Sequence, residues 1–482
     1  MISKKDFKKI SDWLWEIPKD FRADMRVPVR VYLSEKMLEG AFKDRSIEQL
    51  INVSTLPGIQ KYALAMPDMH EGYSSCIGGV AAIDTKEGII SPGMAGYDLN
   101  CGVRILTSEW QEKDIKPYLE KLASEIYKEV PSGLGRGRQL KFSISELDKI
   151  LEGGVPYLVE KGYGEKEDIE HCEGNGKLPW AKSEAVSIQA KNRGRDQVGT
   201  LGSGNHFLEV QKVAEIFDEE VAEAFGLFQD QVVIMVHCGS RGLGHQVCTD
   251  YLREFIPLMF NKYKIKVPDR EFACVPFNSL EGKRYFSAMA SAANYAWANR
   301  QMITHFVRKA WKNILGEKGG KLRLLYDVAH NIIKVEKYKI NEKDMELAVH
   351  RKGATRAFPP GSPEIPERYR KVGQPVLIPG SMGTASYVLA GIESAEQSFY
   401  TTCHGSGRSM SRHAAIRSFS GKKIVEELGK RGIVVKCYSL KGIAEEAPAA
   451  YKNISEVVEV VVQAKISKKV ARLIPLVVIK GE

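Results

Sequence analysis

The sequence predicts an α+β fold, organised as a single large integrated domain of mixed sheets and helices. Strand-like and helix-like segments mix along the 482 residues without a regular alternation. Polar clusters flanked by glycine recur from residue 98 to the C-terminal end, and no low-complexity linker interrupts them. We therefore expect residues 1–482 to form one domain, in which residues 1–60 are a less diagnostic N-terminal region.

The elements of the N-terminal half follow from hydrophobic periodicity. Residues 61–106 are typical of short apolar strands that are broken by glycine-rich turns. Helical periodicity appears within residues 109–171, most clearly at 115–129 and 144–151. The valine-rich run at 231–237 predicts a buried strand, which is followed by a glycine-rich turn.

The C-terminal half begins with a long predicted helix at residues 282–315, where alanines stand among aromatic residues. Residues 359–379 are rich in proline and glycine, so we expect an extended loop there. Three further apolar runs predict strands, at residues 321–328, 456–465 and 474–479.

Composition excludes several classes of protein. An apolar content of 43% and a charged content of 27% are typical of a globular chain rather than a disordered one. No run approaches 18 apolar residues, and the first residues form no apolar signal core, so we expect no membrane span. The eight scattered cysteines include no Cys-x-x-Cys pair, which favours a reducing, cytoplasmic location. The net charge of +10 is compatible with an anionic partner.

Four of the ten histidines lie beside glycine turns or at the ends of apolar runs: His206, His237, His330 and His404. A strand end fixes an imidazole ring, which suits a metal ligand. Asp98 and Cys101 are spaced so that a turn can bring a carboxylate and a thiolate to one metal, and a thiolate can bridge two metals. Such donors suit Mn, Zn, Fe or Co better than Mg or Ca. The alternative for each histidine alone is a hydrogen-bonded core residue, and for Cys101 a small buried hydrophobe.

Residues 402–408 place a histidine in a glycine-rich turn, with an arginine four residues later. Glycine lets the backbone approach a bulky ligand, and Arg408 can hold phosphate oxygens. His404 is then a candidate nucleophile or acid–base group. On this run alone, a surface loop with an incidental histidine is an equally good interpretation.

Basic residues form two clusters along the chain. The first begins at His404 and contains no acid; its members are Arg408, Arg412, Arg417, Lys422 and Lys423. The second is His350-Arg351-Lys352 followed by Arg356. Either cluster alone is more often a solvated face, but the first adjoins the reactive-looking histidine, which favours phosphate binding. The sequence has no Walker-type loop, so any nucleotide is held differently.

The other histidines carry weaker signals. His70 is better interpreted as a turn residue than as a ligand, and His305 is expected to pack within the long helix. No sequence context indicates a function for the last three: His171, His245 and His413.

Several long and specific sequence runs follow one another between residues 91 and 481. They include Gly96-Tyr97-Asp98-Leu99-Asn100-Cys101-Gly102 and Cys403-His404-Gly405-Ser406-Gly407-Arg408. Other such runs lie at residues 91–93, 199–209, 236–244, 326–331, 350–356, 379–383, 445–448, 451–452 and 479–481. Together they resemble the RtcB family of GTP-dependent RNA ligases, from about residue 60 to the end of the chain.

The resemblance implies the family's own α+β arrangement, an RtcB-type fold, with two Mn²⁺ ions at the bottom of a cleft. By this resemblance Cys101 would bridge both ions. The other implied ligands are His237 and His330 at one site, and Asp98 and His206 at the other. His404 would attack the α-phosphate of GTP and carry GMP as a phosphoramidate.

The resemblance also implies binding roles for further residues. Those expected to hold phosphate oxygens are Asn205, Asn331 and Ser381. Those expected to frame the guanine are Phe207, Glu209, Ser386, Tyr451 and Lys480. Gly407 and Arg408 would contact the nucleotide near the ribose, and Arg241 would touch RNA phosphates.

The family's activity would join RNA 3′-phosphate or 2′,3′-cyclic phosphate ends to 5′-hydroxyl ends, through guanylylated histidine and an RNA-ppG intermediate. The resemblance implies tRNA splicing and RNA repair, with tRNA halves or broken RNA as partners and a small activator protein called archease. The basic clusters fit this reading because every species handled is anionic.

The chain departs from the family's pattern in two places. Met94 and Ala95 interrupt the glycine-rich run that follows Ser-Pro, and residues 71–78 differ from the usual version with glycine and proline. These departures keep open a paralogue with a specialised substrate. A metal-dependent phosphoesterase acting on nucleic acid ends, with His404 as its acid, is a further alternative. A non-catalytic RNA-binding protein is disfavoured because the expected metal ligands are intact.

Overall fold

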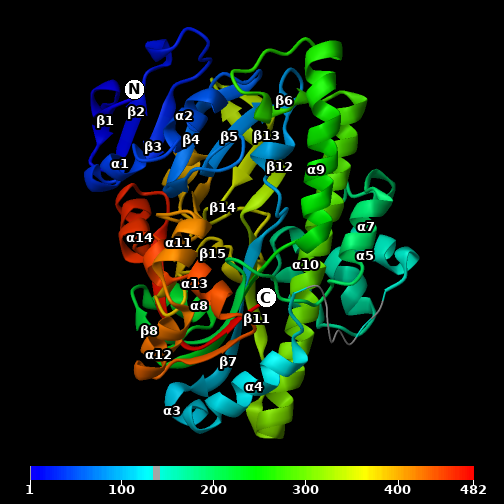
Figure 1. Ribbon diagram of the computed structural model, residues 1–482, viewed down its shortest axis with the longest axis vertical. Helices are drawn as coiled ribbons and strands as arrows, with labels where there is room; N and C mark the ends of the chain where they lie inside the picture. The colour runs from blue at the N-terminus through cyan, green and yellow to red at the C-terminus, as the bar shows by residue number, and fades with distance from the viewer. Residues whose placement is uncertain (1, 134–139, 141, 482) are drawn as a thin grey trace.

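Two large β-sheets and the helices packed on them form one mixed α+β domain, as the sequence predicts (Figure 1). The computed structural model describes residues 2–133, 140 and 142–481. In the first sheet β3 and β4 pair in parallel, and the other neighbours pair antiparallel. Its strands are, in spatial order, β1 (Lys8–Ser11), β2 (Leu14–Ile17), β3 (Val29–Tyr32), β4 (Ile59–His70), β5 (Ile77–Asp84), β13 (Lys343–Lys352) and β12 (Asn331–Ile340).

The second sheet is antiparallel along its main path, and β18 (Val434–Cys437) adds to it by pairing in parallel with β19. The main path runs through β11 (Arg323–Ala329), β7 (Gly102–Gln111), β9 (Gln231–Cys238), β8 (Phe207–Ile216), β19 (Lys468–Lys480), β16 (Ser386–Ala390) and β15 (Pro375–Ile378). Two short pairs complete the strands: β6 (Ile89–Ile90) with β10 (Val275–Pro276), and β14 (Ala354–Arg356) with β17 (Thr401–Cys403).

The strand β9 shows why the sequence signal at 231–237 is a continuous apolar run. Val232, Ile234 and Val236 belong to the core that the second sheet shares with the helices. Val233 and Met235 alternate with them and belong to the core on the opposite face. Because both faces of β9 are covered, every residue of the strand is buried and none needs to be polar for solvent.

The long helix α10 (Leu280–Leu315) packs against three other helices: α4 (Leu119–Glu129), α5 (Ile144–Glu160) and α9 (Arg241–Pro257). Figure 1 shows α9 beside the upper part of α10, which continues alone toward the lower end of the molecule. The Ser279 hydroxyl begins α10 by accepting a hydrogen bond from the Gly282 N–H. Its many buried alanines, such as Ala292, leave room for these close neighbours.

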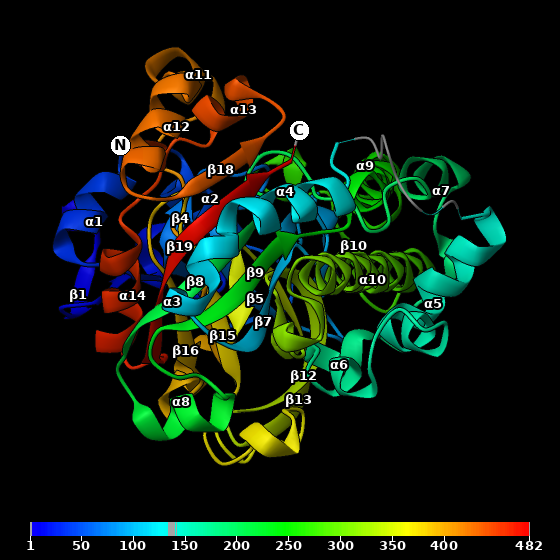
Figure 2. The same ribbon diagram turned by 90° about the horizontal axis from the view of Figure 1, so that it is seen from below.

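The remaining helices are short. In Figure 2 three of them, α11 (Arg412–Ser418), α12 (Gly421–Lys430) and α13 (Leu440–Glu445), gather beside β18 and β19. The others are α1 (Glu35–Ala41), α2 (Ser46–Val53), α3 (Glu112–Ile115), α6 (Lys166–Glu170), α7 (Ile188–Gly194), α8 (Glu219–Phe225) and α14 (Ile454–Gln463). Within the described ranges, no helix combines the length and apolar character needed to cross a membrane.

The strand prediction at residues 456–465 is wrong, because this segment is the helix α14. Its buried residues Ile454, Val457, Val458 and Val461 recur at helical spacing, so one face packs on the core beside β4, β17 and β19. The Asn453 side chain caps the helix by accepting a hydrogen bond from the Ser455 N–H. Packing and capping therefore outweigh the preference of valine for strands.

Candidate functional site

A cleft of about 860 Å³ opens where strand ends of the two large sheets come together. The first sheet contributes His70 at the end of β4 and Lys352 at the end of β13. The second sheet contributes His237 from β9 and Lys480 from β19. The cleft also receives His404, which directly follows β17.

The five side chains predicted as metal ligands meet on the floor of this cleft. They form two groups that share Cys101: Cys101, His237 and His330 in one, and Asp98, Cys101 and His206 in the other. In each group the ligand atoms lie within 4.8 Å of one another. Asp98 and Cys101 share one turn, whereas the three histidines come from other strand ends and turns, so the tertiary fold completes both groups.

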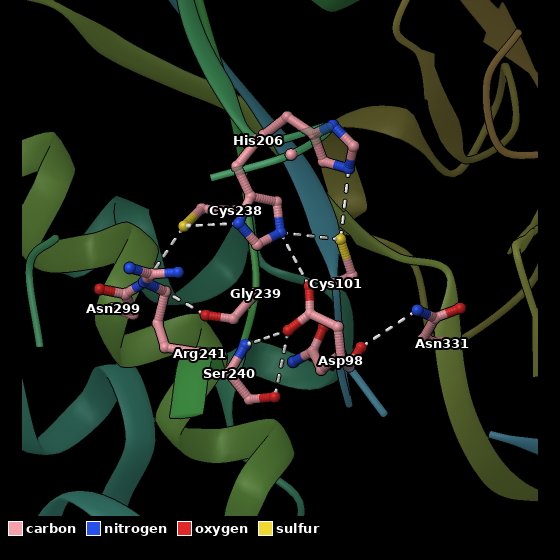
Figure 3. Close-up of polar contacts among 12 residues, drawn as sticks. Asp98, Cys101, His206, Cys238, Gly239, Ser240, Arg241, Asn299 and Asn331 are labelled. Atoms are coloured by element: carbon pink, nitrogen blue, oxygen red, sulfur yellow. Dashed lines mark hydrogen bonds and ion pairs between the residues drawn. The ribbon is translucent and has the colours of Figure 1, made fainter. Parts of the chain in front are cut away.

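The distances within the groups suit shared ions (Figure 3). Cys101 Sγ lies 3.4 Å from His206 Nε2 and 3.3 Å from His237 Nε2. His237 Nε2 lies 3.3 Å from His330 Nε2, and His206 Nε2 lies 2.8 Å from Asp98 Oδ2. Donor atoms that share one transition-metal ion at roughly 2.0–2.3 Å stand about 3–4 Å apart, and three of these four distances lie in that range.

The chemistry of these donors also fits a metal. Burial lowers the pKa of His237 and of His330 well below the ordinary value, so both rings are neutral and offer lone pairs. Burial and the charge of Asp98 raise the pKa of the Cys101 thiol to about 12, and a bound dication reverses that effect by ionising the thiol. A carboxylate, a thiolate and three imidazoles together form a donor set for a transition-metal ion.

Neighbouring groups hold the ligands in place (Figure 3). Asp98 Oδ1 accepts a hydrogen bond from the Ser240 N–H at 3.0 Å, and the Asn331 side chain donates to the Asp98 carbonyl at 3.1 Å. Cys238 Sγ lies 3.8 Å from His206 Nδ1, on the side of the ring that faces away from Cys101. These contacts orient the donors before any ion binds.

His404 is held by a buried carboxylate that the sequence interpretation missed. His404 Nδ1 lies 2.6 Å from Asp68 Oδ2, and the same oxygen accepts from the backbone N–H groups of His404 at 2.8 Å and Gly405 at 3.2 Å. Burial opposes ionisation of Asp68, but His404 and these hydrogen bonds hold its pKa below the ordinary value. The sequence feature that could have indicated Asp68 is its position as the one acid within the apolar run that forms β4.

Most residues predicted to bind the nucleotide line the cleft: Asn205, Phe207, Asn331, Ser381, Gly407, Arg408, Tyr451 and Lys480. Glu209 and Ser386 lie behind this lining, where both are buried. The Gln211 side chain joins them by donating to Glu209 at 2.7 Å and to Ser386 at 3.1 Å. Burial raises the pKa of Glu209 to about 8.

Arg408 belongs to a polar network whose acid was also missed from the sequence. Its guanidinium donates to Glu446 Oε1 at 3.1 Å and to the Tyr451 hydroxyl at 3.2 Å. The Tyr451 hydroxyl donates in turn to Glu446. Lys480 donates to the His206 carbonyl at 2.8 Å, which ties the end of β19 to a metal-ligand loop.

Comparison with known proteins decides the family of the chain. The family model described as "tRNA-splicing ligase RtcB" matches residues 49–481. The chain belongs to the RtcB family. It is 54% identical over 477 residues to a protein of Archaeoglobus fulgidus named tRNA-splicing ligase RtcB, with 98% of both chains covered. Proteins with the same name from Thermococcus kodakarensis and Methanococcus maripaludis are 52% and 50% identical, over 98% and 99% of this chain and 98% and 100% of theirs.

The RtcB-family departures at Met94 and Ala95 lie in the core and not in the cleft. Both side chains are buried, and Met94 packs in the core of the first sheet. In the other departure Ser74 adopts a φ of 66°, and its N–H donates to Glu271 Oε2 at 3.0 Å. Both departures adjoin the lining of the RtcB cleft: Ala95 directly precedes the lining residue Gly96, and the second departure itself contains the lining residue Tyr73.

The expectation that the second basic cluster is a solvated face is wrong, because all its members are buried, although Lys352 also lines the cleft. The Arg351 guanidinium is buried and donates to both carboxylate oxygens of Glu336, at 2.6 and 2.9 Å. Arg356 is also buried and donates to Glu364 at 2.6 Å. Lys352 donates to backbone carbonyls, and His350 is buried. These cations occupy internal positions of the RtcB fold because each finds a partner there.

The first basic cluster is divided between the cleft and the surface. Arg408 and Arg412 line the cleft and pair with Glu446 and Glu445, whereas the other three members are exposed: Arg417, Lys422 and Lys423. Arg241 also lines the cleft, and its guanidinium donates to the Gly133 carbonyl at 2.8 Å. The sequence therefore located the cations of the RtcB cleft but not the acids that position them.

Proposed function

We propose that this RtcB-family chain is a GTP- and manganese-dependent RNA ligase. It would join RNA 3′-phosphate or 2′,3′-cyclic phosphate ends to 5′-hydroxyl ends. One observation carries the proposal: His404, held by Asp68, lies in the same cleft as the five converging metal-ligand side chains. The names of the relatives, tRNA-splicing ligase, support the same class of activity.

In the first step His404 is the nucleophile. Because Asp68 engages Nδ1, the nitrogen left free is Nε2, which forms a bond to the α-phosphorus of GTP. The bond from this phosphorus to the oxygen bridging to the β-phosphate breaks, and pyrophosphate leaves. Asp68 retains the Nδ1 proton and stabilises the positive charge that develops on the ring.

The metal-binding residues would be Asp98, Cys101, His206, His237 and His330, with Cys101 shared between two ions. Bound Mn²⁺ supplies charge neutralisation and alignment for phosphate oxygens. Asn205, Asn331 and Ser381 line the cleft and would hold phosphate oxygens. Their amide and hydroxyl groups can orient the α-phosphate toward His404 by hydrogen bonding.

The guanine end of the nucleotide would be framed by Phe207, Glu209, Ser386, Tyr451 and Lys480. Guanine presents two adjacent N–H donors on one edge, and these donors would favour the ionised form of Glu209, which accepts from both. Gly407 and Arg408 would contact the nucleotide near the ribose. The network of Arg408 with Glu446 supports this role because it fixes the guanidinium in the cleft.

In the second step an oxygen of the RNA 3′-phosphate attacks the phosphorus of the bound GMP, and the bond to His404 Nε2 breaks. This regenerates His404 and gives RNA-ppG. The 5′-hydroxyl oxygen of the other RNA end then attacks the 3′-phosphate phosphorus, GMP leaves with the bridging oxygen, and the hydroxyl proton passes to solvent. A 2′,3′-cyclic phosphate would first be opened by water to the 3′-phosphate.

The partners follow from this reaction. We expect tRNA halves or broken RNA ends as substrates, in tRNA splicing and RNA repair in the cytoplasm, and an archease-type activator. Arg241 would contact RNA phosphates from its position in the cleft, because its guanidinium is held by backbone carbonyls and forms no hydrogen bond to a carboxylate in the described chain.

The test is incubation with GTP labelled at the α-phosphate, with Mn²⁺, followed by a denaturing gel. A covalent label that is labile in acid is expected in the wild type and absent from His404→Ala. The control is His413→Ala, because His413 is an exposed residue of α11 outside the described cleft lining. Release of phosphate from RNA ends without any covalent label would instead indicate a phosphoesterase.

A further inference from the structure

Three aromatic rings lie side by side in the cleft. The rings of Tyr97 and His245 are stacked, with centroids 4.7 Å apart and planes inclined by 28°. The Tyr73 ring lies 5.5 Å from that of Tyr97. All three side chains line the cleft, and His245 is exposed although it takes part in the stack.

The position of these rings connects them to the metal-ligand side of the cleft. Tyr97 directly precedes Asp98, whose carboxylate accepts from the Ser240 N–H at the start of α9. His245 belongs to α9, which begins at Arg241, and both residues line the cleft. The Arg241 cation therefore lies in the same cleft as the stack.

A second cation adjoins His245 from another helix. Arg193 of α7 is exposed and lines the cleft, and its guanidinium donates to the Gln246 side chain at 2.8 Å. Arg193 thus adjoins the stack, and Arg241 lines the same cleft. The exposed His245 ring and the half-buried rings of Tyr73 and Tyr97 offer π-faces in a cleft that also carries positive charge, which is the combination that single-stranded nucleic acid requires.

We propose that Tyr73, Tyr97 and His245 form a stacking subsite for the unpaired terminal base of an RNA strand, with Arg241 on the adjoining phosphate. This inference rests on the proposed function and extends it to one part of the RNA substrate. The rings are not needed for the guanine of GTP, which has its own set of residues around Phe207 and Tyr451. Stacking accepts every base, as an enzyme that joins ends of varied sequence requires.

The experiment uses 2-aminopurine, a base whose fluorescence is quenched when it stacks. One short RNA carries it as the first base of a 5′-hydroxyl end, and another carries it as the last base before a 3′-phosphate. Each RNA is titrated with the full chain in Mn²⁺ without GTP. Quenching is expected for one of the two RNAs, and which one it is identifies the strand end that the subsite holds.

Variants at His245 separate stacking from simple bulk. His245→Ala and His245→Leu should weaken binding of the quenched RNA by roughly fivefold to a hundredfold, because one stacked base contributes an effect of that size. His245→Phe keeps a flat ring and should retain both affinity and quenching. The matched control is His305→Ala, since His305 also contacts a tyrosine, Tyr163, but is not among the described residues that line the cleft.

An abasic nucleotide at the probed position tests the inference without changing the protein. It should weaken binding to the wild type and have little effect on His245→Ala, because the two changes remove the same contact. Equal affinity of the wild type for intact and abasic RNA at both ends would overturn the subsite. If that result came with normal RNA joining, the proposed function would stand; absence of any GMP adduct in the wild type would instead refute the function.

Discussion

At His404, one buried carboxylate selects the ring nitrogen that can react. Asp68→Asn keeps the size of the side chain but removes the charge that holds the Nδ1 proton. We expect the rate of GMP attachment to fall by about a hundredfold or more, because the ring loses both its orientation and its charge partner. A time course with labelled GTP measures this rate. A wild-type rate in Asp68→Asn would show that the pair is only structural.

The buried carboxyl group of Glu209 should make stability depend on pH. Its pKa is raised by burial from 4.5 to about 8, so between these values the folded state keeps a proton that the unfolded state releases. Stability therefore falls as pH rises through this window, by at most about 1.4 kcal/mol per pH unit. Glu209→Gln removes the ionisation, so its stability relative to wild type should increase from pH 5 to pH 8. Urea unfolding at several pH values measures the difference, and a constant difference would contradict the expectation.

The site residues that could be found from the sequence differ from those that were missed in the kind of contact they make. Cys101, His237 and His404 stand in glycine-rich runs or at strand ends, and those settings are visible along the chain. Asp68 and Glu446 position His404 and Arg408, which lie more than 30 residues away from them in the sequence. Sequence patterns mark groups that face a ligand, whereas partners that orient such groups are chosen by the tertiary fold.

At the scale of elements, truncation of two arginines should change two different properties: stability for a buried arginine of a strand, and RNA binding for an arginine of the cleft. Arg351 lies within β13 and pairs with buried Glu336, so Arg351→Ala should lower the free energy of unfolding by about 3–5 kcal/mol. Arg241 begins α9 in the cleft, so Arg241→Ala should instead weaken RNA binding and reduce the slope of log affinity against log salt by about 0.7–0.9. Filter binding of a 3′-phosphate RNA across a salt series measures the slope. An unchanged slope in Arg241→Ala would reject its phosphate contact.

The helix α14 offers a test of why its valines do not form a strand. Asn453→Ala removes the side-chain cap on the Ser455 N–H and should cost about 1 kcal/mol of stability. Asn453→Asp keeps a capping oxygen and should be nearly neutral. Denaturant unfolding compares the two variants, and an equal loss in both would argue against the cap.

The elements that the sequence predicted well share one property. Residues 231–237 and 282–315 match β9 and α10 because their apolar patterns are long and the faces they bury are unambiguous. Residues 456–465 do not match the predicted strand. Valine prefers strands, and neighbouring valines hide the helical spacing of Val457, Val458 and Val461. The choice between the two interpretations depended on the core that this segment covers.

For the molecule as a whole, metal binding should stabilise the fold, since the candidate ligands come from widely separated parts of the chain. Mn²⁺ at a hundredfold excess over its dissociation constant contributes about 2.7 kcal/mol, which corresponds to a rise in Tm of about 3 °C. Cys101→Ser should lose most of this rise because both ligand groups share Cys101. Cys274→Ser, at a buried cysteine in the core of the first sheet, should retain it. Differential scanning calorimetry with and without Mn²⁺ decides between these outcomes.

The position of β19 in the second sheet determines when the cleft can be completed during synthesis of the protein. This strand follows all the others in the chain, yet it lies between β8 and β16 in the interior of the second sheet. While residues 468–480 are still within the ribosome, β8 and β16 lack their shared neighbour, and Lys480 cannot reach the His206 carbonyl. A nascent chain therefore lacks part of the cleft lining until this strand has left the ribosome and docked between its neighbours.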